Sequence, residues 1–367
     1  MTLDLTHSAA FSSRLIEWLR GKAPILIVTH DHPDPDALAA AYALRHLILM
    51  KTGQAAIIAF DGMIGRSENR AMVRELEIET VPLSALDPHE FAVICMVDAQ
   101  PGTGTVSLPP NCRVDLVIDH HPLREATSSC RWSDVRPDYG AAATILFEYL
   151  QAHELIIATK LATILFYAIK SETQSLGREW SPADRDAYRR LLPLSNNRIL
   201  YRITHPSLPQ GYFAKVNTAL ESARIFGDVL VFDLQQVDHP EIVAEMADFL
   251  LRAEGVETVL GSGEYAGEGI LALRSSDQAV NAGHLIQEVT AGFGSAGGHG
   301  QIAGGQIRPL PADTADRADL HDKLVGRLLA ALGRGTIHSA PCSPPEGHAS
   351  WLTAHRGQID TLAPQTL

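Results

Sequence analysis

Residues 25–36 read I-L-I-V-T-H-D-H-P-D-P-D, a short apolar run followed by a polar, proline-braced turn. The apolar run Ile25–Val28 has the length and composition of a buried strand, and a helical pattern over Asp36–Lys51 carries the chain away from the turn. Carboxylate oxygens suit hard divalent cations, and manganese also accepts imidazole. The strand, turn and helix therefore predict a metal site, whose first candidate ligands are His30, Asp34 and Asp36.

The same alternation of strand and helix continues through the first part of the chain. An amphipathic helix is expected at Ser8–Arg20, further strands at Ala55–Phe60, Phe91–Val97 and Val114–Ile118, and a helix at Ser67–Leu76. Such alternation predicts βαβ units and an α/β fold with a mostly parallel sheet flanked by helices. In sheets of this kind, ligands bind beyond the carboxyl ends of the strands.

Asp or His follows three of these predicted strands at the same edge of the sheet. The first strand leads into His30, the third ends at Asp98, and the fourth leads into D-H-H-P at residues 119–122. A carboxylate at the end of a buried strand is costly unless it is paired or metal-bound, so we expect these side chains to converge on one site. The alternatives are that Asp34 or Asp36 only caps the following helix and that Asp98 only forms a turn.

The two consecutive histidines, His120 and His121, have different expected roles. Adjacent side chains after a strand point to opposite sides, so both are not expected to bind one metal. One metal ligand and one substrate contact is the expected division, with Asp119 orienting an imidazole. The alternative is a pair of surface histidines without a role in a site.

The rest of the chain contains a helical stretch and then a second alternation. Helices are expected at Ala141–Gln151, Ile156–Ile169, Pro182–Leu192 and Asn197–Thr204. Strands are then expected at Val229–Leu234, Glu257–Leu260 and Gly269–Arg274, with helices at Pro240–Arg252 and Ala279–Thr290. Proline and polar residues place a domain boundary between Pro193 and Lys215. The predicted organisation is a larger domain over 1–195, a linker over 196–220, a smaller α/β domain over 221–335 with a cleft between the two domains, and a peripheral tail over 336–367.

Composition and charge restrict the classes of function. The 367 residues are 46% hydrophobic and 20% charged, which suits two globular domains. Lys and Arg number 30 against 43 Asp and Glu, giving a net charge of -13, which argues against binding of long duplex nucleic acid. The four cysteines form no C-x-x-C pair and are typical of reduced thiols. No apolar run approaches the ~20 residues of a membrane span and no export signal is recognisable, so we expect a soluble cytoplasmic protein without a membrane partner.

Two features of the second domain predict anion binding. The glycine-rich segment 292–305 would let backbone N–H groups approach an anion. It lacks the Lys-Ser/Thr of a P-loop and follows a predicted helix, so it does not predict nucleoside triphosphate chemistry. Arg274 and Ser275 end a predicted strand, and arginine suits bidentate contacts with phosphate. A flexible loop and a solvated arginine are the alternatives.

These motifs together resemble those of the DHH phosphoesterases. The H-x-x-P-D-x-D-A stretch at residues 30–37, the V-D at 97–98 and the I-D-H-H-P at 118–122 are similar to the first three motifs of that family. Gly297-Gly298-His299, followed by Ala303-Gly304, is similar to the G-G-H signature of the companion substrate-binding domain, DHHA1. The family comprises manganese-dependent enzymes, among them single-strand exonucleases, oligoribonuclease/pAp phosphatases, cyclic-dinucleotide phosphodiesterases and polyphosphatases.

The resemblance implies a role for each motif residue. One Mn²⁺ would be held by His30 and Asp34, the other by Asp36 and His120, and Asp98 would bridge them. With Asp98 and His120, His121 would form the catalytic group, facing the phosphate. The residues implied in substrate binding lie in the second domain and are Arg274, Ser275, Gly297, Gly298 and His299.

The fourth motif of the family departs from its usual form here. The family's T-D-T is replaced by Ser171-Glu172-Thr173, so that Glu172 stands where a metal-binding Asp is expected. The extra methylene still allows Glu172 to reach a cation and alters the geometry. The alternative is that Glu172 is only a carboxylate at a helix end.

The function that the resemblance implies is two-metal hydrolysis of a phosphoester, with two Mn²⁺ ions as cofactors and Mg²⁺ or Co²⁺ as alternatives. Such cations lower the pKa of a water and neutralise charge on the phosphoryl oxygens. The expected substrates are short oligonucleotides (nanoRNA), pAp or linear dinucleotides, and homodimers are common in the family. The alternative functions are a polyphosphatase or pyrophosphatase, and a nucleotide-binding regulator with a degraded active site. A dinucleotide-binding oxidoreductase would require a glycine fingerprint after the first strand, where this chain has H-D-H-P-D.

Overall fold

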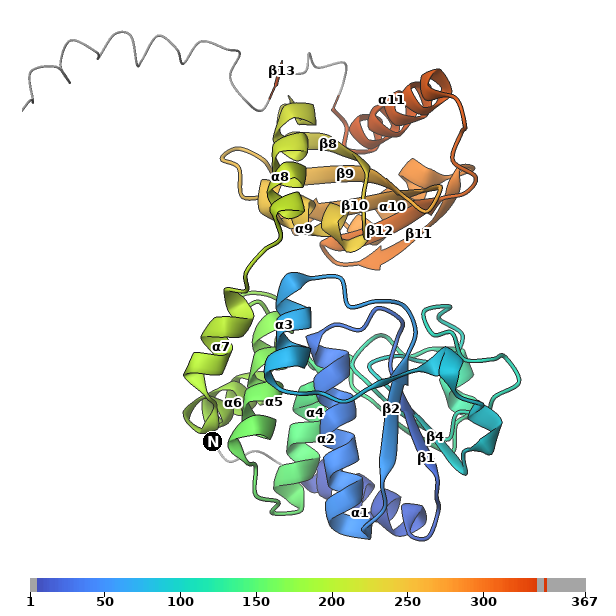
Figure 1. The fold of residues 1–367 in the computed structure, drawn as a ribbon, viewed down its shortest axis with the longest axis vertical. Helices are drawn as coiled ribbons and strands as arrows, with labels where there is room; N and C mark the ends of the chain where they lie inside the picture. The colour runs from blue at the N-terminus through green and yellow to red at the C-terminus, as the bar shows by residue number, and fades with distance from the viewer. Residues whose placement is uncertain (1–4, 335–339, 342–367) are drawn as a thin grey trace, which may run out of the picture. The chain divides into compact units, whose positions relative to one another are not determined.

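The computed structural model describes residues 5–334 and 340–341. The chain forms two compact units, Met1–Ser207 and Leu208–Leu367, each of which has its own sheet (Figure 1). The segment 196–220, predicted as a linker, contains the helices α7 (Asn197–Thr204), which the sequence predicts, and α8 (Gln210–Ser222). Of the predicted tail 336–367, all but residues 340–341 lies outside the described part of the chain.

The first unit alternates strand and helix as the sequence predicts. Its other elements, in chain order, are α1 (Thr6–Leu19), β1 (Ile25–Val28), α2 (Pro35–Thr52), β2 (Ala56–Phe60), α3 (Ser67–Glu75), β3 (Val81–Pro82), β4 (Val93–Val97), β5 (Leu116–Asp119), β6 (Trp132–Val135), α4 (Ala142–Ala152), α5 (Thr159–Glu172) and α6 (Pro182–Leu191). Short 3-10 turns lie at Leu83–Ala85, Pro88–Glu90, Glu125–Ser129 and Leu192–Leu194.

The sheet of the first unit is entirely parallel, in the order β3-β2-β1-β4-β5-β6. The chain passes from β1 to β2 on one side and later to β4 on the other, so the strand order reverses between β1 and β4. Ligands of open parallel sheets bind at such a reversal, beyond the carboxyl ends of the strands. The predicted metal ligands at residues 30, 98 and 120 follow β1, β4 and β5 at this edge.

Alternate residues of the strands enter two different cores. Ile25 and Ile27 of β1 pack with α1, α2, α4 and α5, whereas Leu26 and Val28 pack with the segments that connect the strands, including Leu83. Both faces are therefore covered, which is why β1 and β4 are apolar throughout (Figure 1). This burial fixes the strands whose ends carry the predicted ligands.

The second unit has a mixed sheet with helices on both faces. Its remaining elements are β7 (Arg224–Phe226), β8 (Val229–Gln236), α9 (Glu241–Leu250), β9 (Thr258–Tyr265), β10 (Glu268–Ser275), α10 (Ala282–Thr290), β11 (Gly294–His299), β12 (Ile302–Ile307), α11 (Thr314–Ala331) and β13 (Ala340–Pro341). The strand order is β11-β12-β10-β9-β8-β7-β13, and only the β8–β9 pair is parallel among the described pairs. One core contains α8 and α9, and the other contains α10 and α11. The unit is a smaller α/β domain, as the sequence predicts.

The glycine-rich segment is a β-hairpin and not a flexible loop. Gly294–His299 pairs antiparallel with Ile302–Ile307, so that Gly298 lies opposite Ala303. A Cβ on Gly298 would overlap the Ile302 carbonyl, and a Cβ on Gly283 of α10 would overlap the Gly298 carbonyl. Gly298 therefore fits closely against β12 and Gly283 lets α10 approach the hairpin, packing roles that the sequence pattern did not predict.

Candidate metal centre

Asp98 lies at the centre of the predicted ligands, directly after β4. Its Oδ2 is 3.6 Å from His30 Nε2 and its Oδ1 is 3.4 Å from His120 Nε2, so each carboxylate oxygen faces a different histidine. The residue has a φ of 54°, a left-handed conformation that costs a non-glycine residue free energy and is concentrated at functional sites. Burial alone would raise the pKa of Asp98, but His120 and His30 outweigh it and hold that pKa well below its usual range.

The first group around Asp98 consists of His30 and Asp34, whose ligand-type atoms lie within 4.8 Å of one another and of Asp98. His30 Nδ1 lies 2.8 Å from the Asp31 carbonyl, and this hydrogen bond directs Nε2 toward the carboxylates. Asp34 has two roles, because Oδ1 accepts from the first backbone N–H groups of α2 at 2.9 and 3.0 Å while Oδ2 lies 4.0 Å from His30 Nε2. One oxygen of Asp34 thus caps α2, while the other is free to act as a metal ligand.

The second group whose ligand-type atoms lie within 4.8 Å of one another consists of Asp98, His120 and His121, and Asp36 lies beside His120. His120 Nδ1 lies 3.1 Å from the Tyr139 carbonyl, which directs Nε2 toward Asp98 and, at 3.8 Å, toward Asp36 Oδ2. Asp36 accepts from the backbone N–H groups of Ala142 at 2.6 Å and Ala143 at 2.9 Å. It therefore caps the N-terminus of α4, which has no capping side chain of its own, and this contact ties α2 to α4.

His121 faces the same carboxylate as His120. His121 Nδ1 is 3.7 Å from Asp98 Oδ1 and 2.9 Å from Asp119 Oδ1. The expectation that the two rings point to opposite sides is wrong, because β5 ends at Asp119 and the alternation of a strand no longer applies to the next two residues. The predicted orienting contact of Asp119 is present and is made to His121, whose side chain is 38% exposed.

Glu172 ends α5 and lies at the margin of the cluster. Within the described residues, the groups of His, Asp and Glu whose ligand-type atoms lie within 4.8 Å of one another include neither Glu172 nor Asp36. Glu172 is nonetheless near enough to interact electrostatically with Asp34, His120 and Asp98. The structure thus brings Glu172 toward the ligands without placing it among them.

The carboxylates of this cluster repel one another. Burial, followed by the charge of Asp98, raises the pKa of Asp36 well above its usual range. Burial raises the pKa of Glu172 to about 7, and Asp34 contributes to the rise. Burial alone would lower the pKa of His30, but Asp98 and Asp34 outweigh it and raise that pKa to about 10. A site in which protons partly balance crowded carboxylates is electrostatically suited to a cation.

Gln100 was not among the predicted site residues, because it belongs to none of the motifs. Gln100 is 1% exposed, and its Nε2 donates to Asp119 Oδ2 at 2.7 Å. A buried amide two residues after a predicted ligand is the signal that could have found it, since a buried polar group requires partners.

The predicted substrate-binding residues of the second unit lie on β10 and β11. Arg274 is buried, with its Nε 2.6 Å from Asp248 Oδ1 and its Nη1 3.2 Å from the Ala303 carbonyl. Ser275 is also buried, and its hydroxyl lies 3.2 Å from that of Thr258. These contacts give both residues a structural role, so the expectation of a solvated arginine is wrong and substrate contact stays a prediction. Gly297 and Gly298 are exposed in the hairpin, and the side chain of His299 lies outside the described part of the structure.

Comparison with known families agrees with this arrangement. Residues 24–169 match the N-terminal domain of the DHH family, and residues 227–325 match the DHHA1 domain. The chain belongs to the DHH family. Its DHH domain contains every predicted metal ligand except Glu172, which lies three residues beyond the matched range.

Relatives of this DHH protein are found among sequences and solved structures. An uncharacterized protein of Methanocaldococcus jannaschii is 33% identical over 287 residues, which cover 78% of this chain and 58% of the relative's length. An exopolyphosphatase-related protein from Bacteroides fragilis has a TM-score of 0.71 at 15% identity, covering 89% of this chain and 98% of its own. RecJ from Thermus thermophilus, solved with Mn²⁺, has a TM-score of 0.50 at 15% identity, covering 90% and 55%. At 15% identity, the similarity to these two solved structures establishes a shared fold and nothing more.

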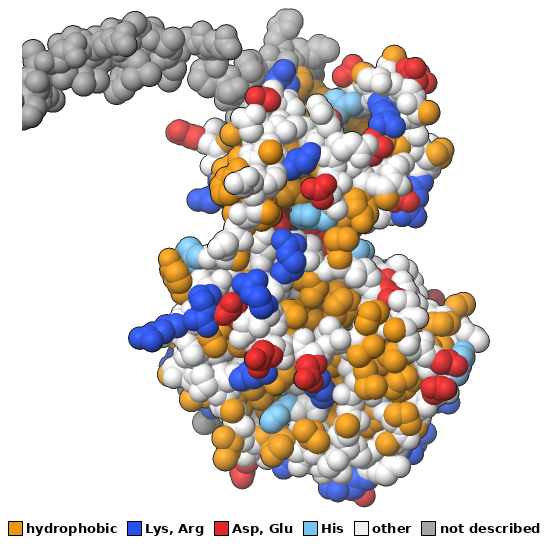
Figure 2. Space-filling model, in the orientation of Figure 1, with side chains coloured by type: hydrophobic (Ala, Val, Ile, Leu, Met, Phe, Trp, Pro, Cys, Tyr) orange, Lys and Arg blue, Asp and Glu red, His pale blue; other side chains and the backbone are white. Residues whose placement is uncertain are grey.

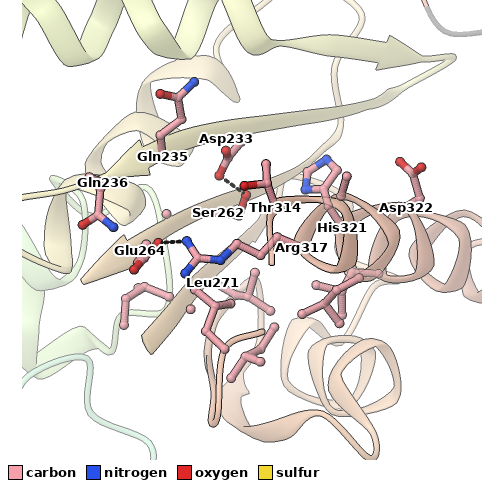
Figure 3. A pocket seen from close by; sticks show the side chains of 18 residues that line it. Asp233, Gln235, Gln236, Ser262, Glu264, Leu271, Thr314, Arg317, His321 and Asp322 are labelled. Atoms are coloured by element: carbon pink, nitrogen blue, oxygen red, sulfur yellow. Dashed lines mark hydrogen bonds and ion pairs between the residues drawn. The ribbon is translucent and has the colours of Figure 1, made fainter. Parts of the chain in front are cut away.

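The DHHA1 domain also contains a cavity of about 520 Å³ between its sheet and α11 (Figure 3). Leu271 and Ile270 belong to its apolar wall, and on its polar side Arg317 is paired with Glu264 and Ser262 donates to Asp233 at 2.7 Å. None of the residues predicted to bind substrate lines this cavity. Within the described residues, no helix has both the length and the apolar character needed to cross a membrane.

Proposed function

We propose that this chain is a phosphoester hydrolase that uses two Mn²⁺ ions, for which Mg²⁺ or Co²⁺ can substitute. The observation that carries the proposal is the position of Asp98, whose two oxygens face His30 and His120 in separate groups of ligands. A carboxylate between two such groups is the arrangement that a pair of neighbouring cations requires.

The donor set fits a pair of hard cations. Asp98 Oδ1 is buried, and no described residue donates a hydrogen bond to it, which is unfavourable for a carboxylate unless a cation binds there. Both His30 and His120 direct Nε2 toward the carboxylates and use Nδ1 on a backbone carbonyl, the usual second contact of a metal-binding imidazole. One cation would be held by His30, Asp34 and Asp98, and the other by Asp36, Asp98 and His120, with Glu172 at its margin.

The residues of the proposed site have two roles. Some would hold the cations, and others would act on the substrate. When bound, the cations would lower the pKa of a water and neutralise charge on the phosphoryl oxygens. His121 is more exposed than His120 and is held by Asp119 through Nδ1, which supports a role for its ring in contacting the phosphate and protonating the leaving oxygen. Asp119 keeps the orientation of this ring and would stabilise its protonated form.

The substrates that we propose are short oligonucleotides or phosphorylated nucleotides, such as nanoRNA, pAp and linear dinucleotides. The DHHA1 domain supports nucleotide substrates over polyphosphate, because its G-G-H signature belongs to the nucleotide-cleaving branch that the motifs resemble. The net charge of -13 disfavours long strands. On the face in Figure 2, Lys and Arg side chains gather over α3 and α7, where Arg74 and Arg202 are both paired with Glu75. Glu75 therefore partly neutralises this area.

A substrate panel tests this proposal. Purified full-length protein is incubated with Mn²⁺ and with pAp, a linear dinucleotide, a five-residue RNA or polyphosphate, and the released phosphate or mononucleotide is measured. We expect hydrolysis of the nucleotide substrates, dependent on Mn²⁺ and lost in Asp98→Ala. Hydrolysis of polyphosphate or pyrophosphate alone would establish the alternative enzyme. Nucleotide binding without any hydrolysis would establish a regulator, and an Asp98→Ala variant of unchanged activity would refute the role of Asp98.

A further inference from the structure

Gln100 connects the strand that carries the central carboxylate to the loop that carries both histidines. It lies two residues after Asp98, is 1% exposed, and reaches across to the segment that follows β5. Its own backbone carbonyl accepts from Thr103 Oγ1 at 3.0 Å, which closes the turn that holds it. A long polar side chain is thus fully buried beside the site.

Every polar atom of the Gln100 amide is engaged. Nε2 lies 2.7 Å from Asp119 Oδ2, 3.1 Å from the Pro122 carbonyl and 3.4 Å from the His121 carbonyl. Oε1 accepts from Arg124 N at 2.8 Å and from Thr127 Oγ1 at 2.7 Å. One side chain therefore holds both ends of the loop from residue 119 to residue 127.

Asp119 connects Gln100 to the imidazole of His121. Asp119 uses Oδ2 on Gln100 and Oδ1 on two donors, the His120 backbone N–H at 2.8 Å and His121 Nδ1 at 2.9 Å. Because the carboxylate is planar, a hydrogen bond that fixes Oδ2 also fixes the direction of Oδ1. The orientation of His121 consequently depends on a donor at position 100.

The side chain at position 100 must donate a hydrogen bond to Asp119 and accept hydrogen bonds from Arg124 and Thr127. An amide does both. Glutamate would keep the acceptor for Arg124 and Thr127 but would place a carboxylate oxygen against Asp119, and methionine would keep the shape but provide neither donor nor acceptor. The distances are thus those expected of an amide that donates to Asp119.

We propose that Gln100 is a positioning residue, which holds Asp119 so that His121 presents its ring to the substrate phosphate. This inference rests on the proposed function for the role of His121, while the contact chain from Gln100 to His121 stands on the structure itself. Loss of a supporting contact of this kind lowers activity by about 10- to 100-fold.

The kinetic test compares Gln100→Glu with Thr127→Val, which removes a contact to the same amide without touching Asp119. With the nucleotide substrate that the panel identifies, we expect kcat to fall about 10- to 100-fold in Gln100→Glu, with KM and bound Mn²⁺ unchanged and Thr127→Val close to wild type. A kcat within twofold of wild type, or an equal loss in Thr127→Val, would overturn the proposal. If Gln100→Glu does not fold, Gln100→Met takes its place with the same expectation.

A double-mutant cycle tests the contact directly. In Gln100→Glu with Asp119→Asn, the new asparagine amide donates to the new glutamate and its carbonyl still accepts from His121, so the polarity of the contact is reversed and the contact is kept. We expect the double variant to be more active than the product of the two single effects predicts, because the residues are coupled. Simple additivity would contradict a Gln100–Asp119 contact that matters for turnover.

A spectroscopic measurement separates this inference from the proposed function. In full-length protein with ¹⁵N-labelled histidine and diamagnetic Mg²⁺, the Nδ1–H proton of His121, assigned with His121→Gln, should be observed in wild type and in Thr127→Val. We expect the resonance to shift or to exchange away in Gln100→Glu. An unchanged resonance would overturn the inference even if hydrolysis is observed, and a lost resonance supports it even if every substrate of the panel fails.

Discussion

Asp34 combines a helix cap with a proposed metal contact, and two substitutions separate these roles. Asp34→Asn keeps an Oδ1 that can accept from the first N–H groups of α2, now at 2.9 and 3.0 Å, but replaces the oxygen that faces His30. Asp34→Ala removes both. Asn is as good an N-cap as Asp, whereas Ala costs about 1 kcal/mol, so without metal only Asp34→Ala should lower the free energy of unfolding by that amount.

Mn²⁺ binding should stabilise the folded protein by much more than the helix cap does. At a free Mn²⁺ concentration of 100 times the wild-type Kd, binding stabilises the folded protein by about 2.7 kcal/mol. A variant that binds 100-fold more weakly gains only about 0.4 kcal/mol at the same concentration. For a unit of this size, the site that contains Asp34 should raise the wild-type Tm by roughly 5–11 °C. In either Asp34 variant this contribution should fall to roughly 1 °C, while the site of Asp36 and His120 keeps its own contribution.

Tryptophan fluorescence reports the unfolding of the unit that contains Asp34. The tryptophans of the described residues, Trp18, Trp132 and Trp180, all lie in this first unit. The matched control is Asn196→Ala, which removes the cap of α7 in the same unit and should keep the full Mn²⁺ shift. A wild-type Mn²⁺ shift in Asp34→Asn would refute the metal role of Asp34, and an equal metal-free stability of Asp34→Asn and Asp34→Ala would refute the cap.

Three further predictions concern other parts of the molecule. Arg136→Met should lower the free energy of unfolding of the first unit, measured by urea denaturation, by about 3–5 kcal/mol. The reason is that the substitution leaves the buried carboxylates of Asp134 and Glu148, now 2.6 and 2.7 Å from the guanidinium, without their partner. A loss below about 1 kcal/mol would contradict this. Burial alone would raise the pKa of Asp134, but Arg136 outweighs it and lowers that pKa, so this stabilisation is present above the unfolded pKa of about 3.9 and is lost as the pH falls through the folded value. Gly298→Ala should cost about 1–3 kcal/mol in the second unit, measured by hydrogen exchange of α10 and the hairpin, whereas Gly326→Ala on α11, where a Cβ meets nothing within 4 Å, should cost nothing. Glu172→Gln should weaken one of two Mn²⁺ sites roughly tenfold, or about 1.4 kcal/mol, in a calorimetric titration, and an unchanged isotherm would show that Glu172 is only a helix-end carboxylate.

The strands and turns of the first unit could be predicted because their signals are local. The apolar run of β1, the turn with Asp34 and the following helical pattern are adjacent in sequence, and the polar residue after each strand marks one edge of the sheet. The convergence of His30, Asp98 and His120 follows from strand order alone. Contacts such as Asp36 with α4 join residues more than 100 positions apart, so no local pattern contains them.

Elsewhere the sequence pattern could not show contacts that depend on tertiary packing. Glycine disfavours strands, yet residues 294–299 form β11, in which Gly298 fits against β12 and Gly283 of α10 lets that helix approach the hairpin. Arg274 at a strand end was expected to be solvated or to contact phosphate, and its pairing with Asp248 depends on where α9 lies. Gln100 carries no motif, and its importance is visible only through the partners that the fold brings to it.

The central claim is that Asp98 joins two cations, and the number and coupling of bound Mn²⁺ ions test it most directly. Metal analysis after equilibrium dialysis and electron paramagnetic resonance are applied to the wild type and to Asp98→Ala. The proposed arrangement predicts two Mn²⁺ per wild-type chain with an exchange-coupled spectrum, and loss of that coupling in Asp98→Ala. A single Mn²⁺ per chain with an isolated six-line spectrum, or a coupled spectrum that persists in Asp98→Ala, would contradict it.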